Sequence, residues 1–168
     1  MELFSRLSKL FHKHPRMSSV SVFRRADTFF VVTLHGSRGS DPCIEAGPLE
    51  VLPIGAKPAD LGEAVFRGLD RTTYNYPYPS SKHEWKSVSE PLLSAAGCKS
   101  WSAFAKHSSN LRVNQVGSKL HVLPSARDAK GAFFPVNERE HHIEGPSAEQ
   151  LGALVATELA FASHRDDA

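Results

Sequence analysis

The sequence predicts an α+β fold: a single domain with a mainly antiparallel sheet of about five or six strands and helices packed on it. Short runs rich in β-branched and aromatic residues follow one another with only turn residues between them, which is typical of hairpins. Other segments repeat their apolar residues every three or four positions, as amphipathic helices do. The 168 residues, 40% of them hydrophobic, suffice for one core, so we assign residues 1–168 to one domain.

The first fifteen residues predict a peripheral helix, because residues 3–11 form an apolar stripe that ends near Pro15. We expect this helix to cover an edge of the core. Basic residues between its apolar positions leave open a helix on a membrane surface. The segment lacks the apolar centre and cleavage site of a signal peptide, so we expect a cytoplasmic protein.

The next segments predict a hairpin and a further strand. A strand around Val20 and Val22 and a second over residues 28–34 are separated by a turn at residues 24–27. The second strand is apolar on both faces, so it should be central in the sheet. Residues 35–48 predict a loop, and residues 49–54 predict a short strand.

The middle of the chain predicts helices around an extended loop. Residues 60–70 form a helical pattern, with Pro58 just before it and Asp60 as its cap. Prolines make residues 72–81 an extended loop. Two short helices follow, one over residues 91–96 that ends at Gly97, and one over residues 101–107 capped by Ser100.

The last third of the chain predicts a second hairpin and a long helix. Residues 110–116 and 119–123 are strand-like, joined by a two-residue turn, and Pro124 should stop the second strand. Residues 132–136 predict a less regular strand. Residues 147–163 predict the clearest helix, because Ser147 and Gln150 have the spacing of a capping box.

Residues 55–69 resemble residues 145–159, which indicates a weak internal repeat. Both segments contain a leucine and a glycine at the start of a helix, Leu61-Gly62 and Leu151-Gly152. A true repeat predicts two helices that pack similarly on one sheet, with each glycine allowing close backbone approach. Chance similarity between two amphipathic helices is the alternative.

The sequence predicts no catalytic residue, cofactor or metal. It contains no phosphate-binding glycine loop, nucleophile elbow or paired-histidine zinc motif. His141 and His142 are adjacent, so on a strand they point to opposite faces and cannot easily share a metal. We interpret the stretch around Glu140 as solvated, and the cysteines as reduced thiols. A nucleic-acid-binding regulator or a small hydrolytic enzyme using this histidine-rich stretch is the alternative class.

Three tyrosines and three glutamates are the predicted partner-binding residues. Tyrosines two positions apart in a proline-restrained loop offer rigid aromatic anchors, unless their rings pack on the core. Clustered glutamates offer an acidic patch, unless they are only solvated. A net charge of +2 does not indicate direct nucleic-acid binding, and no apolar run is long enough to span a membrane. The predicted set is Tyr74, Tyr76, Tyr78, Glu138, Glu140 and Glu144. We expect Trp85 and Trp101 in the core or at its rim.

Residues 96–106 resemble the central signature of an immunity-protein family from bacterial contact-dependent growth inhibition. The similar residues are Ala-Gly-Cys-Lys-Ser-Trp at 96–101 and Phe-Ala-Lys at 104–106, preceded by Trp85 and followed by two strands and a proline. Cys98 stands where the family pattern has valine or a similar residue, which is a conservative departure. The resemblance implies a non-enzymatic protein that binds and neutralises a cognate C-terminal toxin domain. Many such toxins are nucleases, some acting on tRNA.

Overall fold

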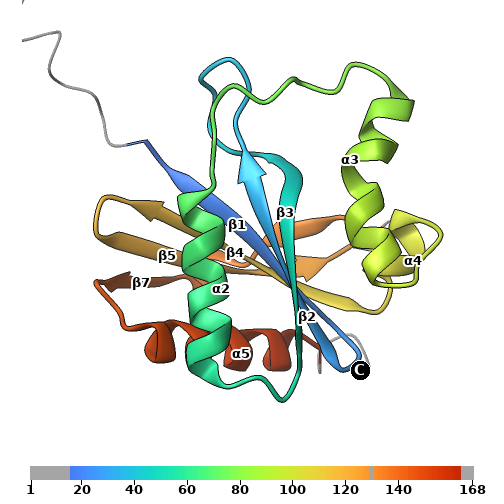
Figure 1. Ribbon diagram of the computed structural model, residues 1–168. Coiled ribbons are helices and arrows are strands. Elements are labelled where there is room, and N and C mark those ends of the chain that lie inside the picture. Colours follow the sequence, from blue (N-terminus) through green and yellow to red (C-terminus); the bar gives the residue numbers. More distant parts are fainter. Residues whose placement is uncertain (1–15, 129–130, 164–168) are drawn as a thin grey trace, which may run out of the picture.

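The computed structural model describes residues 16–128 and 131–163, so the predicted N-terminal helix lies outside the described residues. The described residues form a seven-stranded sheet with helices on both faces, which confirms the α+β class. Figure 1 shows how these elements are arranged. Its strands are β1 (Ser18–Arg25), β2 (Thr28–His35), β3 (Ile44–Pro53), β4 (Ser108–Val116), β5 (Lys119–Arg127), β6 (Phe133–Pro135) and β7 (His141–Glu144). Its helices are α2 (Pro58–Asp70), α3 (Lys82–Ala95), α4 (Trp101–Ala105), α5 (Ala148–Ser163) and the 3₁₀ turn η1 (Asn137–Arg139).

The sheet is antiparallel throughout, in the order β3-β2-β1-β4-β5-β6. Strands β6 and β7 both pair with β5, β7 along its first half and β6 along its end. The hairpins β1–β2 and β4–β5 confirm the predicted turns, and Gly117 adopts a left-handed conformation in the second turn, with φ of 62°. The strand β7 was not predicted.

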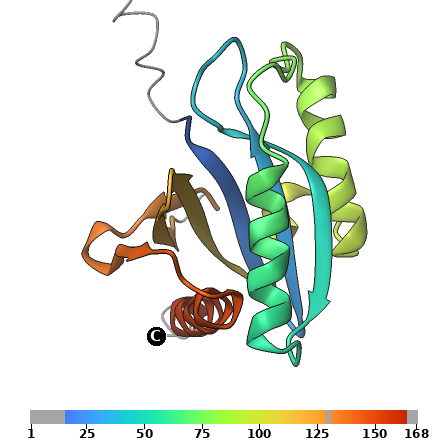
Figure 2. The same cartoon turned by 60° about the vertical axis from the view of Figure 1, so that its left-hand side comes forward.

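Alternating side chains of the central strands divide the core between the two faces of the sheet. Val20 and Val22 of β1 point toward α2 and α5, whereas Phe23 points toward α3 and α4. Figure 2 shows α2 and α3 on opposite sides of β3. The larger cluster lies under α2 and α5. The smaller one contains Phe23, Phe30, Val32, Leu92, Leu93 and Phe104.

The helices α2 and α5 cross at the two glycines that the internal repeat singles out. A Cβ atom added to Gly62 would lie 1.9 Å from the carbonyl oxygen of Ala148, and one added to Gly152 would lie 1.8 Å from that of Pro58. Both helices pack on the same face of the sheet, α2 over β1 and β2, and α5 over β4 and β5. The repeat's prediction of close backbone approach is therefore confirmed.

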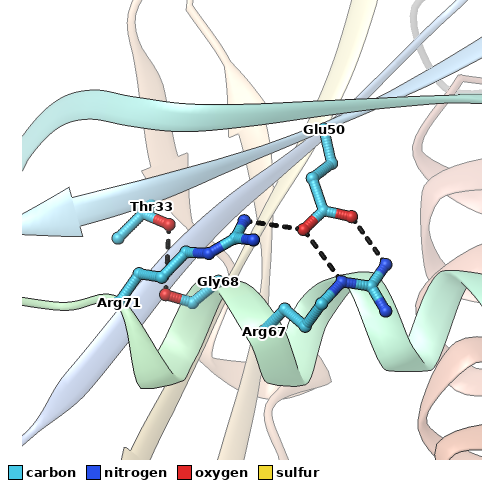
Figure 3. A network of polar contacts seen from close by, with 5 residues as sticks. All are labelled: Thr33, Glu50, Arg67, Gly68 and Arg71. Carbon is cyan, nitrogen blue, oxygen red and sulfur yellow. Dashed lines mark hydrogen bonds and ion pairs between the residues drawn. The ribbon is translucent and has the colours of Figure 1, made fainter.

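A polar network fixes α2 to the sheet (Figure 3). Arg67 donates two hydrogen bonds to the carboxylate of Glu50 on β3, at 3.1 and 2.7 Å, and Arg71 donates a third at 2.8 Å. Nearby, the hydroxyl of Thr33 donates to the carbonyl of Gly68. The hydrogen bond from Arg67, helped by the charges of both arginines, holds the pKa of Glu50 below its ordinary value.

Two predicted boundaries on the first half of the chain were wrong. The strand β3 begins at Ile44, not at Leu49, because Ile44 and Glu45 already pair with β2 before an irregularity shifts the register. The helix α2 begins at Pro58, and its N-cap is Lys57. Asp60 lies in the first turn instead, where its negative charge is favourable near the helix N-terminus.

The helix predicted over residues 91–96 is only the end of a 14-residue helix, α3. Ser81 caps it by accepting a hydrogen bond from the Glu84 backbone N–H, and the Glu84 carboxylate accepts one from the Ser81 backbone N–H, which completes a capping box. Pro91 lies inside the helix, where it removes one backbone hydrogen bond. As predicted, Gly97 follows the helix end in a left-handed conformation, with φ of 63°.

Pro124 does not stop β5, which continues to Arg127. The carbonyl of Pro124 accepts a hydrogen bond from the amide of Val136. The backbone polar groups of Pro124 therefore point away from β4, toward the side of β5 that pairs with β7 and β6. The strand β4 does not use an N–H group of Pro124 for pairing. The proline is tolerated for that reason.

Candidate partner-binding site

The sheet face opposite α2 and α5 is only partly covered, and its open part is polar. The helix α3 packs over β3, and α4 packs beside β4. Next to them, Asn110, Arg112 and Asn114 of β4 line a hollow. Asn114 accepts a hydrogen bond from the buried Ser19 hydroxyl at 2.6 Å, so this side chain keeps a hydrogen-bond partner if another protein covers the face.

A cleft of about 830 Å³ lies between α3, α4 and β3. Trp85 of α3 is 42% exposed at this cleft, so the prediction that Trp85 belongs to the core or its rim was wrong. Trp101 is half-buried and packs edge-on against Phe23, with ring centroids 6.0 Å apart, as expected of a rim residue. Leu92 and Leu93 make another wall of the cleft apolar, and Lys82, Lys86 and Lys99 also line the cleft.

A second hollow of about 410 Å³ adjoins the cleft, and Glu45 and Trp101 line both. The hydroxyl of Ser21 donates a hydrogen bond to the Glu45 carboxylate, and Arg112 lies nearby on β4. Burial raises the pKa of Glu45, while the Ser21 hydrogen bond and the charge of Arg112 offset part of this effect. The two hollows therefore form one concave surface with aromatic walls and a charged floor.

The three predicted tyrosines lie along the loop between α2 and α3, and two of them are held by the body of the protein. The Tyr74 hydroxyl donates to the carbonyl of Met17, and the Tyr76 ring stacks on His35 with centroids 5.2 Å apart. Tyr78 is 59% exposed and meets the edge of Trp85, with centroids 5.7 Å apart. Of the three, Tyr78 therefore fits an interface anchor best.

The buried His35 anchors the tyrosine loop. The backbone N–H of Thr73 donates to its Nδ1 at 3.2 Å, and its Nε2 meets the carbonyl of Gly47. The Thr73 hydroxyl also lies 2.9 Å from Nδ1. This hydroxyl–imidazole pair resembles a nucleophile and its base, but Nε2 faces a backbone carbonyl rather than an orienting carboxylate. We therefore assign His35 a structural role in shaping the loop.

The three predicted glutamates lie around β7, away from the tyrosine loop. Glu138 is exposed on η1, and Glu144 accepts a hydrogen bond from the Ser118 hydroxyl at 3.1 Å. Glu140 lies beside the rings of His121 and His142. The structure thus places Tyr78 beside α3 and the glutamates around β7, which pairs with β5.

The histidine-rich stretch divides between the two faces of the sheet, as its alternation predicts. His141 points toward α5, where its Nε2 lies 3.0 Å from the carboxylate of Glu158. His142 points to the opposite face, next to its cross-strand partner His121. One carboxylate oxygen of Glu140 lies 3.2 Å from His121 Nδ1 and 3.3 Å from His142 Nε2. These three side chains form a cluster that could hold a metal ion.

Sequence reasoning missed Trp85, Glu45 and His121 as site residues. The spacing of Ser81 and Glu84 is a capping-box signal that would have placed Trp85 on a helix. No local signal marks Glu45 or His121, because each joins its neighbours only through the pairing of strands distant in sequence.

The fold is similar to those of two solved structures, although no protein-family model and no curated protein match the chain. One is a protein of unknown function from Neisseria meningitidis, with a TM-score of 0.72 and 17% identity over 89% of this chain and 97% of that one. The other is a chain of a CdiA-CT/CdiI toxin and immunity complex from Yersinia pseudotuberculosis. Its TM-score is 0.70, with 14% identity over 88% of this chain and 97% of that one. Within the described residues, every helix is too short or too polar to cross a membrane.

Proposed function

We propose that this chain is an immunity protein of a contact-dependent growth inhibition system, which binds a cognate toxin domain and blocks it as a heterodimer. The observation that carries the proposal is the likeness of nearly the whole fold to a chain of a toxin and immunity complex. We assign the immunity role rather than the toxin role because the sequence around Trp101 resembles the signature of an immunity family. Such a protein acts in the cytoplasm and needs no chemistry of its own.

We infer that the toxin covers the concave surface between α3 and β5. A stable complex of this kind buries about 1,600 Å² in total. The exposed rings of Trp85 and Tyr78 and the adjoining hollows offer the aromatic anchors and the pockets that dominate binding energy. The same surface is bordered by the predicted glutamates, so one partner could touch both predicted groups.

The charges at the two ends of this surface differ in sign, which defines what the partner should present. Three lysines, Lys82, Lys86 and Lys99, surround the cleft beside α3, whereas three glutamates lie around β7. We infer that the toxin is acidic where it meets α3 and basic where it meets β7. A nuclease, such as one that cleaves tRNA, fits the requirement for a basic surface at β7, because its substrate groove is basic.

A small metal-dependent hydrolase is the second candidate, and the His121, Glu140 and His142 cluster is the observation that favours it. Hydrolysis of RNA or of a simple ester by the isolated chain, abolished by His142→Asn, would support this candidate. An inactive chain that still neutralises a toxin would support the first.

Co-expression tests the proposed function. The test needs a candidate toxin, which is the C-terminal domain of any large exported protein found to be encoded next to this gene. That domain is produced in bacterial cytoplasm with or without this chain. We expect growth to be restored and the two proteins to co-purify as a heterodimer. Trp85→Ala should weaken rescue, whereas Phe161→Ala is a matched control, because Phe161 is a 54% exposed aromatic on α5. Unrestored growth together with separate elution of the two proteins would contradict the proposal.

A further inference from the structure

We propose that His121, Glu140 and His142 form a zinc-binding site with an open fourth coordination position. Two imidazoles and one carboxylate are a ligand set that Zn²⁺ uses in proteins where three side chains hold the metal and the fourth position stays open. The proposal goes beyond toxin binding and does not depend on it, because it rests only on the geometry of this cluster.

The pairing of β5 with β7 sets the positions of the ligands. His121 and His142 are direct cross-strand partners, and their ring centroids lie 4.3 Å apart on the face away from α5. Glu140 immediately precedes β7, where its carboxylate reaches both rings. Because backbone hydrogen bonds of the sheet fix these positions, metal binding would need little ordering of the chain.

The distances between the ligand atoms already approach those of a tetrahedral zinc site. Bonds of about 2.0–2.2 Å in a tetrahedron place neighbouring ligand atoms about 3.3–3.5 Å apart. The Glu140 oxygen lies 3.2 Å from His121 Nδ1 and 3.3 Å from His142 Nε2. All three ligand atoms lie within 4.8 Å of one another, so only the two imidazole nitrogens need to approach.

The exposure of the three side chains leaves the metal an entry path. The side chains of Glu140 and His121 are 24% and 35% exposed, so they are mostly covered by the sheet. The His142 side chain, on the edge strand, is 62% exposed. A zinc ion here would therefore keep one coordination position toward solvent, available to water or to a side chain of a bound protein.

The neighbouring His141 shows why the proposal applies to one face of β7 only. Its partner Glu158 is also bound by the guanidinium of Arg139. The fixed positive charge of that arginine opposes a divalent cation, although the residue types resemble those of the cluster. His141 therefore supplies a matched control from the same strand.

Isothermal titration of the untagged full chain with ZnCl₂ tests the proposal. We expect one zinc ion to bind to the wild type and to His141→Asn with the same affinity. We expect His142→Asn and Glu140→Gln to lose more than ~100-fold in affinity, above the loss typical of residues that only orient a ligand. Absence of zinc binding, or equal affinity in all four proteins, would overturn the proposal.

Thermal unfolding with and without zinc separates ligand loss from misfolding. Zinc should raise the unfolding midpoint of the wild type and of His141→Asn, because it binds the folded chain. Without zinc, His142→Asn should unfold at nearly the wild-type temperature, because its side chain is largely exposed. If zinc still raised the midpoint of His142→Asn by the wild-type amount, the ligand assignment would be wrong.

Discussion

Replacing Gly152 by alanine tests the packing of the helix layer that supports the sheet. In an exposed helix, alanine is about 1 kcal/mol more stable than glycine, so propensity alone predicts a gain. Here, however, the new Cβ atom would lie 1.8 Å from the Pro58 carbonyl oxygen and 2.8 Å from the Gly62 nitrogen. Both are backbone atoms that cannot rotate away. The helices α2 and α5 must therefore separate, and the core beneath them must open.

Overpacking of a core costs about 1–3 kcal/mol, and more where the neighbours cannot yield. Taking ~3 kcal/mol for this backbone clash and subtracting the gain in propensity leaves a net loss of about 2 kcal/mol for Gly152→Ala. Urea unfolding followed by tryptophan fluorescence and by circular dichroism measures this change, provided both probes report one transition.

Ala153→Gly supplies the control, because Ala153 is the next residue of α5 and is exposed. This change should cost only about 1 kcal/mol, the difference in helix propensity. A Gly152→Ala protein as stable as the wild type, or more stable, would refute the close-contact reasoning.

Three further predictions concern the binding face and the charges. Trp85→Ala should weaken toxin binding by at least ~2 kcal/mol, as the loss of other aromatic anchors does, and should leave the unfolding midpoint nearly unchanged. Titration calorimetry measures the first effect and scanning calorimetry the second. Because the pKa of Glu45 is raised in the folded state, stability should fall as pH rises from the ordinary value of 4.5 toward the raised pKa; Glu45→Gln should remove this slope in pH-dependent urea unfolding. Because the pKa of Glu50 is lowered, its contribution is present above the ordinary value and lost as pH falls through the lowered pKa. Glu50→Gln should therefore cost up to ~1 kcal/mol at neutral pH, and less in high salt, because the partners Arg67 and Arg71 are largely exposed.

Features specified by neighbouring residues could be predicted from the sequence. The two hairpins follow from β-branched runs and short turns, and α5 follows from the capping box of Ser147 and Gln150, whose two hydrogen bonds form as expected. The glycine pair at the helix crossing was also predictable, because a repeated glycine in a helix has a packing reason. In each case the physical cause acts within a few residues or recurs in two similar segments.

Features that depend on distant partners could not be predicted. The strand β7 is short and polar, so its own composition does not favour a strand, and its pairing with β5 stabilises it. His121 and His142 are 21 positions apart, and only the register of those two strands brings their rings together. The helix α3 was predicted only at its end, over residues 91–96, although the capping box of Ser81 and Glu84 is a local signal for its start.

The positions of the predicted tyrosines also depend on distant partners. The proline-rich loop is extended as expected, but two of its tyrosines contact the protein body through groups that the loop sequence does not reveal, Met17 and His35. Only Tyr78 projects beside Trp85. The role of the tyrosines and glutamates in partner binding stays a prediction.

Hydrogen–deuterium exchange of the chain, alone and mixed with the cognate toxin domain, tests the central claim most directly. If the chain works by covering the toxin with its concave face, amides of α3, the tyrosine loop and β7 should gain protection in the mixture, whereas those of α2 and α5 should not change. Protection confined to α2 and α5, or no change in any segment at saturating toxin concentration, would contradict the account.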